Sequence, residues 1–281
     1  MNALSSAAVL RAGGSAFVLD LTGPRPPRVL HWGADLGELT GDAITNLALA
    51  QRLGRGHSAF DTPVPPSLTR DGGEGFFGTP GVMGHRAGRA FSNRFELASP
   101  NVADNAATIV CIDRDAALEL TAHFEMTPQG VLKVTYSLKN IGDSDFVLND
   151  LNIALPLSSK ATHHTDFTGN WSREFHPQTR TIDVGTWARE VREGRTGHDF
   201  TLTFNAHTAD ASFQHGELWT ISLGWSGNTR HFVEQIPDGT KWIGASELLL
   251  PGETILAPGD SYSTPTLYAV HSDAGFDGVA A

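Results

Sequence analysis

Short runs of alternating apolar and polar residues, separated by turn residues, dominate this sequence. Residues 116–126, 131–138 and 146–155 are three such runs, with Pro128-Gln-Gly130 and Asn140-Ile-Gly-Asp-Ser144 between them. Side chains of a strand point to opposite faces in turn, so a period of two indicates half-buried strands. The turn residues between the runs favour short connections. These residues therefore predict three strands in an antiparallel meander.

The same pattern returns toward the C-terminus. Residues 217–225 and 229–236 flank Ser226-Gly-Asn228 and predict a hairpin, and further strands are expected over 242–250 and 261–270. Helical periodicity occurs only over 42–53, which predicts one short helix. We find no fixed-period repeat and no low-complexity linker. The expectation is an all-β, antiparallel chain that forms a single domain over residues 1–281.

Composition excludes several classes of protein. The 281 residues carry a formal net charge of −11, which disfavours a nucleic-acid partner because a phosphate backbone is itself anionic. The single cysteine, Cys111, permits no internal disulfide and no cysteine-based metal site. No apolar run is long enough for a membrane-spanning helix, and Met1–Arg11 lacks the features of a signal peptide. A cytoplasmic location without a membrane partner is therefore expected.

Few residues stand out as a catalytic or metal site. His163 and His164 are adjacent on an expected strand and point to opposite faces, so the pair alone cannot chelate one ion. Neither a metal nor a cofactor is expected. Acidic residues lie in apparent loops, but sequence alone cannot pair them as glycoside hydrolysis requires. They are Asp61, Asp71, Glu74, Asp166, Glu174 and Glu190.

Several segments, read in order, resemble the N-terminal domain of glycoside hydrolase family 36. They are Val29-Leu-His-Trp-Gly33, the loop through Gly73-Glu-Gly-Phe-Phe-Gly-Thr-Pro80, Gly169-Asn-Trp-Ser-Arg-Glu174, Leu223-Gly-Trp-Ser-Gly-Asn228 and Leu250-Pro-Gly-Glu253. Each motif is weak alone, whereas the ordered set is specific. Two departures are present. The loop of residues 65–77 lacks the tyrosine- and arginine-rich character common in the family and has Gly-Phe-Phe-Gly instead, and in residues 195–198 Thr196 and Gly197 replace serines.

The resemblance implies a large β-supersandwich of the galactose-mutarotase type, packed on a (β/α)₈ barrel that follows it. It also implies hydrolysis of terminal α-galactosides with retention, by two aspartates of that barrel. A barrel needs about 250 residues more, so we expect no catalytic residue in this chain and no activity from it alone. The implied partners are the barrel, further copies of the whole protein and the α-galactoside.

The resemblance also implies that a loop of this domain reaches the sugar site. Asp61, Phe76 and Phe77 are the candidates by position, because aspartate accepts hydrogen bonds from hydroxyls and phenylalanine stacks on a sugar ring. Asp61 as the cap of a turn is an equally weighted interpretation. Trp171 and Trp225 rank lower, since such residues more often anchor interfaces.

Two other functions fit an all-β chain of this composition. One is a stand-alone carbohydrate-binding sandwich. The other is an epimerase-like supersandwich that acts on sugars with a histidine and a glutamate, ranked last because no such pair is identifiable from the sequence.

Overall fold

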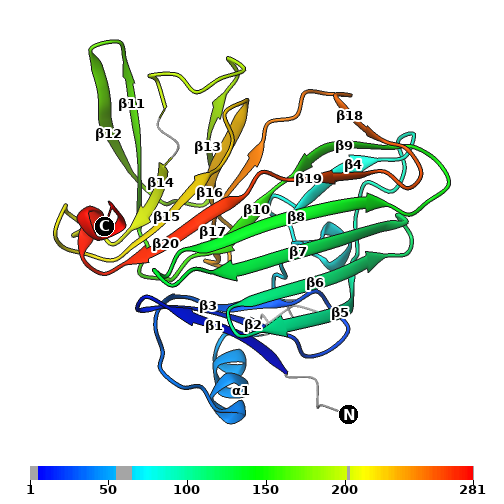
Figure 1. Cartoon of the computed structure of the whole chain (residues 1–281), viewed down its shortest axis with the longest axis horizontal. Coiled ribbons are helices and arrows are strands. Elements are labelled where there is room, and N and C mark those ends of the chain that lie inside the picture. Colours follow the sequence, from blue (N-terminus) through cyan, green and yellow to red (C-terminus); the bar gives the residue numbers. More distant parts are fainter. Residues whose placement is uncertain (1–5, 55–64, 201–202, 281) are drawn as a thin grey trace.

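The computed structural model describes residues 6–54, 65–200 and 203–280. These residues form twenty strands, two α-helices and one 3₁₀ helix. Every ladder between the strands is antiparallel, and the expected all-β class is confirmed. The fold is a β-sandwich in which a large sheet runs across the molecule (Figure 1).

The large sheet has ten strands. In spatial order they are β12 (Arg173–Thr181), β11 (His163–Asn170), β14 (Thr203–His207), β15 (Leu218–Leu223), β20 (Leu267–Ser272), β8 (Leu132–Asn140), β7 (Leu118–Met126), β6 (Ala106–Asp113) and β5 (Glu96–Ala103), with β19 (Ser261–Ser263) also paired to β8. Strict alternation of buried residues along β6, β7 and β8 explains the period of two in their sequence. One face of these strands is therefore the core face.

Three smaller sheets complete the sandwich. They are β10 (Ile153–Pro156), β17 (Lys241–Glu247), β16 (Thr229–Gln235) and β13 (Gly185–Val191); β1 (Ala7–Ala12), β2 (Ser15–Asp20) and β3 (Arg28–Ala34); and β18 (Thr254–Leu256), β9 (Phe146–Leu151) and β4 (Val82–His85). Along β16 and β17, Val233 and Ile243 belong to the main core, whereas Phe232 and Trp242 form a second cluster. Side chains on both faces of β16 and β17 are consequently buried.

Two predicted pairings are wrong. Strand β9 does not extend the meander of β7 and β8, because it pairs with β4 and β18. Strands β15 and β16 do not form a hairpin, because β15 pairs with β14 and β20 while β16 pairs with β13 and β17. The hairpin partner of β16 is β17, across Pro237-Asp-Gly-Thr240, a sequence that favours a tight turn. Residues 224–228 instead lead the chain from one sheet to another.

The expected short helix is confirmed as α1 (Gly41–Ala50). Thr40 caps it by accepting a hydrogen bond at Oγ1 from the Ala43 N–H at 3.2 Å. No residue of α1 is buried, and the helix stands below the sheet of β1, β2 and β3 (Figure 1). A second helix, α2 (Gly275–Ala280), was not predicted. Its six residues are too short to establish a helical period.

Candidate functional site

The loop of residues 65–81 crosses the four-stranded sheet on the face opposite the main core. It contains the 3₁₀ helix η1 (Gly72–Glu74). The Phe76 ring packs edge-on against Trp242, with 6.3 Å between centroids, and joins the second apolar cluster with Phe232 and Ala154. The loop that the sequence singled out is thus packed on a sheet.

Thr79 fixes this loop through hydrogen bonds of its N–H, its hydroxyl and its carbonyl. Its N–H lies 3.0 Å from each carboxylate oxygen of Glu234, and its hydroxyl donates to Oε1 at 2.9 Å. The carbonyl of Thr79 accepts from Nε of Arg70 at 3.1 Å. Glu234 is buried and also accepts from the Thr186 hydroxyl at 2.7 Å. Hydrogen bonds to charged groups are stronger than those between neutral groups, so the contacts of Thr79 with Arg70 and Glu234 hold the loop firmly.

Arg70 is a fully buried cation at the base of the loop. Its guanidinium donates to Oδ1 of Asn152 and lies 5.3 Å from the Trp242 ring centroid. Burial lowers the pKa of Arg70, while the negative charges of Glu234 and Asp150 oppose that shift. The residue adopts a left-handed backbone with φ of 48°, which is costly for a non-glycine residue. Such strain persists only where surrounding contacts enforce it.

Asp71 is held beside Arg70 by a backbone contact. Its Oδ2 accepts from the Phe95 N–H at 2.8 Å. Burial raises the pKa of Asp71 to about 7 and outweighs that hydrogen bond, which by itself lowers the pKa. Asp71 therefore faces the protein interior and is not presented to solvent.

Phe77 is the residue that this arrangement holds outward. Its side chain is 94% exposed, between Phe76, which packs inward, and Gly78. A Cβ at Gly78 would lie 2.7 Å from both Oε2 of Glu234 and the Phe76 ring, so only glycine fits there. The loop consequently presents one large apolar ring to water.

The other predicted contact residues lie elsewhere or outside the described part of the chain. Asp61 falls within residues 55–64, outside the described residues. Trp171 lies at the tip of the β11–β12 hairpin and is 78% exposed. Trp225 lies between β15 and β16 and is 39% exposed. The structure therefore places neither tryptophan in the loop of residues 65–81.

Two histidines of the described residues contact carboxylates, His198 at Glu174 and His215 at Asp210, where Nε2 lies 2.8 Å from Oδ2. Nδ1 of His198 lies 3.8 Å from Oε1 of Glu174, beside the Trp171 ring, with both side chains partly exposed. His164 is buried against Trp187 and Phe204, and burial lowers its pKa to about 4. Among residues 6–54, 65–200 and 203–280, no group of three or more His, Cys, Asp or Glu side chains is arranged to hold a metal.

Sequence reasoning did not identify Arg70, Thr79 or Glu234. Glu234 lies 155 residues from Thr79 and sits in an ordinary alternating strand. The one sequence signal for Glu234 is an acidic residue within a largely buried strand, because a buried charge requires partners. The sequence names no partner at that distance.

Replacing Glu234 with glutamine is expected to destabilise the protein by roughly 1–3 kcal/mol, because an amide NH₂ would face the donors of Thr79 and Thr186. The measurement is urea unfolding together with limited proteolysis of residues 65–81, which we expect to accelerate. Glu193→Gln, at an exposed position, is the matched control. Equal cleavage of both variants would show that Glu234 does not hold the loop.

No helix within the described portion of the chain has the length and apolar character needed to cross a membrane.

A family model and several known proteins are similar to much of this chain. The family model described as "Glycosyl hydrolase family 36 N-terminal domain" matches residues 25–257. An α-galactosidase of Escherichia coli is 33% identical over 252 residues, covering 90% of this chain and 35% of that protein. α-Galactosidase AgaA of Geobacillus stearothermophilus is 29% identical over 112 residues, covering 40% of this chain and 15% of AgaA. The chain thus spans about a third or less of these relatives.

Solved structures share the fold. A variant of AgaA in complex with raffinose superposes with a TM-score of 0.83 at 20% identity, covering 97% of this chain and 41% of that one. The α-galactosidase of Lactobacillus brevis superposes with a TM-score of 0.83 at 17% identity, covering 97% and 40%.

Proposed function

The chain belongs to the glycosyl hydrolase family 36 N-terminal domains, and from this premise we propose that it is the non-catalytic part of a retaining α-galactosidase. It packs on a (β/α)₈ barrel, takes part in oligomer contacts and lends the loop of residues 65–81 to the sugar site. The substrates are terminal α-galactosides, and the whole protein is cytoplasmic. The observation that carries the proposal is the outward Phe77 on a loop fixed by Arg70 and Glu234.

The anchored loop supports contact with a sugar. A phenylalanine ring in water is unfavourable, and the charged contacts around Thr79 fix the loop that carries it. The apolar C–H face of a pyranose fits such a ring. We assign Phe77 to ring stacking and Phe76 to support of the loop, because Phe76 packs on Trp242. Asp61 is the proposed acceptor for sugar hydroxyls.

Two of the acidic residues that the sequence singles out, Asp71 and Asp166, support a non-catalytic role. Retaining hydrolysis needs two carboxylates about 5 Å apart on either side of the scissile bond. Asp71 faces the interior, and Asp166 is fully buried between Arg180 and Arg189, with N–O distances of 3.3 and 3.0 Å. Neither is available to a substrate. We therefore place the nucleophile and the acid/base in the barrel.

Exposed apolar surface supports packing against a barrel or another copy. Trp171, Phe175 and Phe213 are largely exposed, and helix α1 buries none of its leucines. Large apolar side chains in water commonly mark interaction surfaces.

Residues 1–281 alone are expected not to hydrolyse p-nitrophenyl α-galactoside, whereas the same chain joined to its barrel is expected to be active. Release of p-nitrophenol measures both. Turnover by residues 1–281 at the rate of the joined protein would contradict the non-catalytic assignment.

Phe77→Ala in the barrel-bearing enzyme is expected to raise KM for raffinose about tenfold, the effect of losing roughly 1.4 kcal/mol of stacking. Because the Phe77 side chain is 94% exposed, the urea midpoint of the Phe77→Ala variant should equal that of the natural protein. Steady-state kinetics separate KM from kcat, and Val184→Ala, also at an exposed position, is the control. An unchanged KM in both variants would remove Phe77 from the sugar site.

A further inference from the structure

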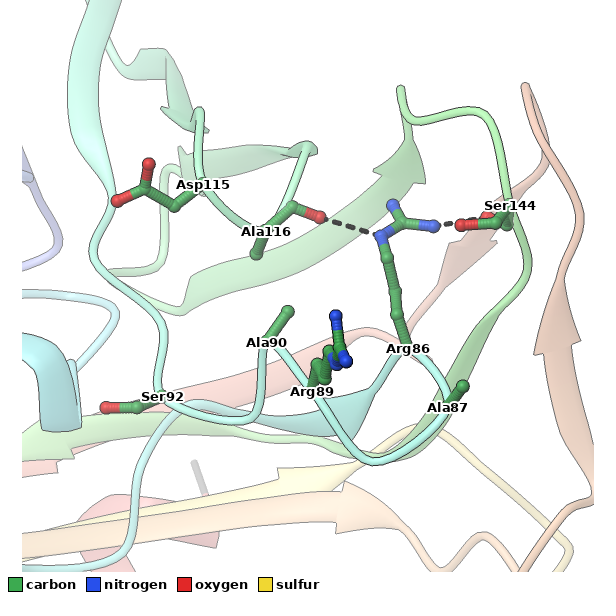
Figure 2. Close-up of a pocket in the computed structure, with 8 residues that line it drawn as sticks. All are labelled: Arg86, Ala87, Arg89, Ala90, Ser92, Asp115, Ala116 and Ser144. Carbon is green, nitrogen blue, oxygen red and sulfur yellow. Dashed lines mark hydrogen bonds between the residues drawn. The ribbon is translucent and has the colours of Figure 1, made fainter.

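A recess that Phe77 does not line lies beside residues 72–73 of the 65–81 loop, where the Gly73 N–H donates to the Asn93 carbonyl at 3.0 Å. It has a volume of about 660 Å³ and is walled by the turn of residues 86–92, by Asp115 and Ala116, and by Ser144 (Figure 2). The first wall connects β4 to β5, the second connects β6 to β7, and Ser144 lies between β8 and β9. Neither Phe76 nor Phe77 lines it.

Arg86 makes one wall of this recess rigid. Its guanidinium donates to the carbonyls of Ala116 at 3.0 Å and Ala117 at 3.1 Å, to Oδ1 of Asn140 at 2.5 Å, and to the carbonyl of Ser144. A Cβ at Gly142 would lie 2.7 Å from Nη2 of Arg86, so glycine is needed beside it. The wall therefore exists before any ligand arrives, as is usual for binding sites.

Strained backbone surrounds the same recess. Six non-glycine residues in the described part of the chain have positive φ, and three of them are Ala87 at 44°, Ala90 at 56° and Ala117 at 51°. Ala87 lies in the tight turn where Arg86 and Arg89 exchange two backbone hydrogen bonds of 2.7 and 2.8 Å. Left-handed alanine is unfavourable, and such residues cluster at functional sites.

The polar groups of the recess are unused by the protein. Within residues 6–54, 65–200 and 203–280, the structure shows no hydrogen bond or ion pair for the Arg89 guanidinium, the Asp115 carboxylate or the Ser92 hydroxyl. An anion would meet the carboxylate, and a cation would meet the guanidinium. A neutral ligand with many hydroxyls satisfies both, since each hydroxyl donates and accepts.

Apolar contacts in the recess agree with such a ligand. Ala87, Ala90 and Ala116 line it beside the polar groups. A sugar ring carries hydroxyls at its edge and an apolar C–H face, which matches this mixture. The volume falls within the range of small-molecule sites.

We propose that the Arg89–Asp115 recess is a saccharide-binding site in which Phe77 takes no part. Arg89 donates to sugar oxygens, Asp115 accepts from sugar hydroxyls, and the alanine methyl groups contact the ring. The site goes beyond the proposed function and does not depend on it, because it requires neither the barrel nor the Phe77 side chain.

Titration calorimetry of the folded chain with raffinose tests this site, with sodium phosphate as the anion probe. We expect millimolar binding of raffinose, weakened at least about tenfold in Arg89→Ala and in Asp115→Asn, the effect of losing one charge-assisted hydrogen bond. Arg114→Ala, an exposed neighbour that does not line the recess, is the matched control and should bind normally. Phe77→Ala should also bind normally, which separates this proposal from the loop.

Three results would overturn the proposal: no raffinose binding, equal binding by Arg89→Ala and Arg114→Ala, or binding of phosphate in place of raffinose. Urea midpoints of the variants confirm that each is folded. If Phe77→Ala alone loses binding, the recess is not the site and the loop is.

Discussion

Arg70→Ala is expected to destabilise the fold by about 3–5 kcal/mol, the usual cost of removing one partner from a buried charged network. The change leaves the carbonyl of Thr79 and Oδ1 of Asn152 without their donor. It also removes the cation whose charge opposes those of Glu234 and Asp150, and it opens a cavity over Trp242. The measurement is the free energy of unfolding in urea.

Two further variants sharpen that result. Arg52→Ala, on an exposed arginine after helix α1, should change stability by less than about 0.5 kcal/mol. Arg70→Lys should recover only part of the loss, because a lysine cannot reproduce the planar fork that serves Thr79 and Asn152 together. If alanine at position 70 costs no more than alanine at position 52, the loop is not anchored through this guanidinium.

His231→Phe is expected to make the protein less sensitive to acid than the natural chain. His231 is fully buried on β16, against Phe200 and Phe204, and neither ring nitrogen has a hydrogen-bond partner. Arg189 is its cross-strand neighbour on β13, and Asp166 pairs with that arginine. Burial lowers the pKa of His231 from 6.5 to about 3, so the ring stays neutral in the fold.

The sign of this effect follows from proton binding. Between pH 6.5 and about pH 3, His231 binds a proton in the unfolded chain but stays neutral in the folded chain. The free energy of unfolding is therefore highest above pH 6.5 and falls as the pH decreases toward 3. At about pH 4.5, two units below 6.5, the loss is roughly 3 kcal/mol, since each unit contributes roughly 1.4 kcal/mol. His164, with a pKa of about 4, acts in the same direction.

The difference between natural chain and variant is the quantity to measure. Asp71 acts in the opposite direction, because its raised pKa of about 7 favours the fold as the pH falls toward 3.8. Urea unfolding from about pH 7.5 to about pH 4.5 should therefore show the natural chain losing roughly 3 kcal/mol relative to His231→Phe. His176→Phe, on exposed β12, is the control. Parallel curves for the natural chain and His231→Phe would disprove the assignment.

The strands were predictable because alternation is a local property. Burial along β7 and β8 alternates residue by residue, as their sequence does. The partners of β9 and β16 were not predictable, since alternation states which face a residue occupies and not which strand lies beside it. The turn at residues 237–240 was the local signal for the true hairpin, and the glycines after β15 misled because they join two sheets.

The candidate site was found in part. The family resemblance singled out the loop through residues 73–80, and its two phenylalanines were named together. Their separation into one ring on Trp242 and one in solvent depends on Gly78 and on Glu234, which belongs to a distant strand. The recess at Arg89 was not expected, because its walls come from three connections that lie apart in the sequence.

The sequence by itself determined the all-β class, the short helix after Thr40, the position of the exposed loop and, through ordered motifs, the family. Each of these depends on residues close in the chain or on motifs read in order. Only the tertiary structure decided which strands pair, which phenylalanine faces water and where buried charges meet. Those outcomes depend on contacts such as that of Thr79 with Glu234, across 155 residues, and a local pattern carries no information about so distant a partner.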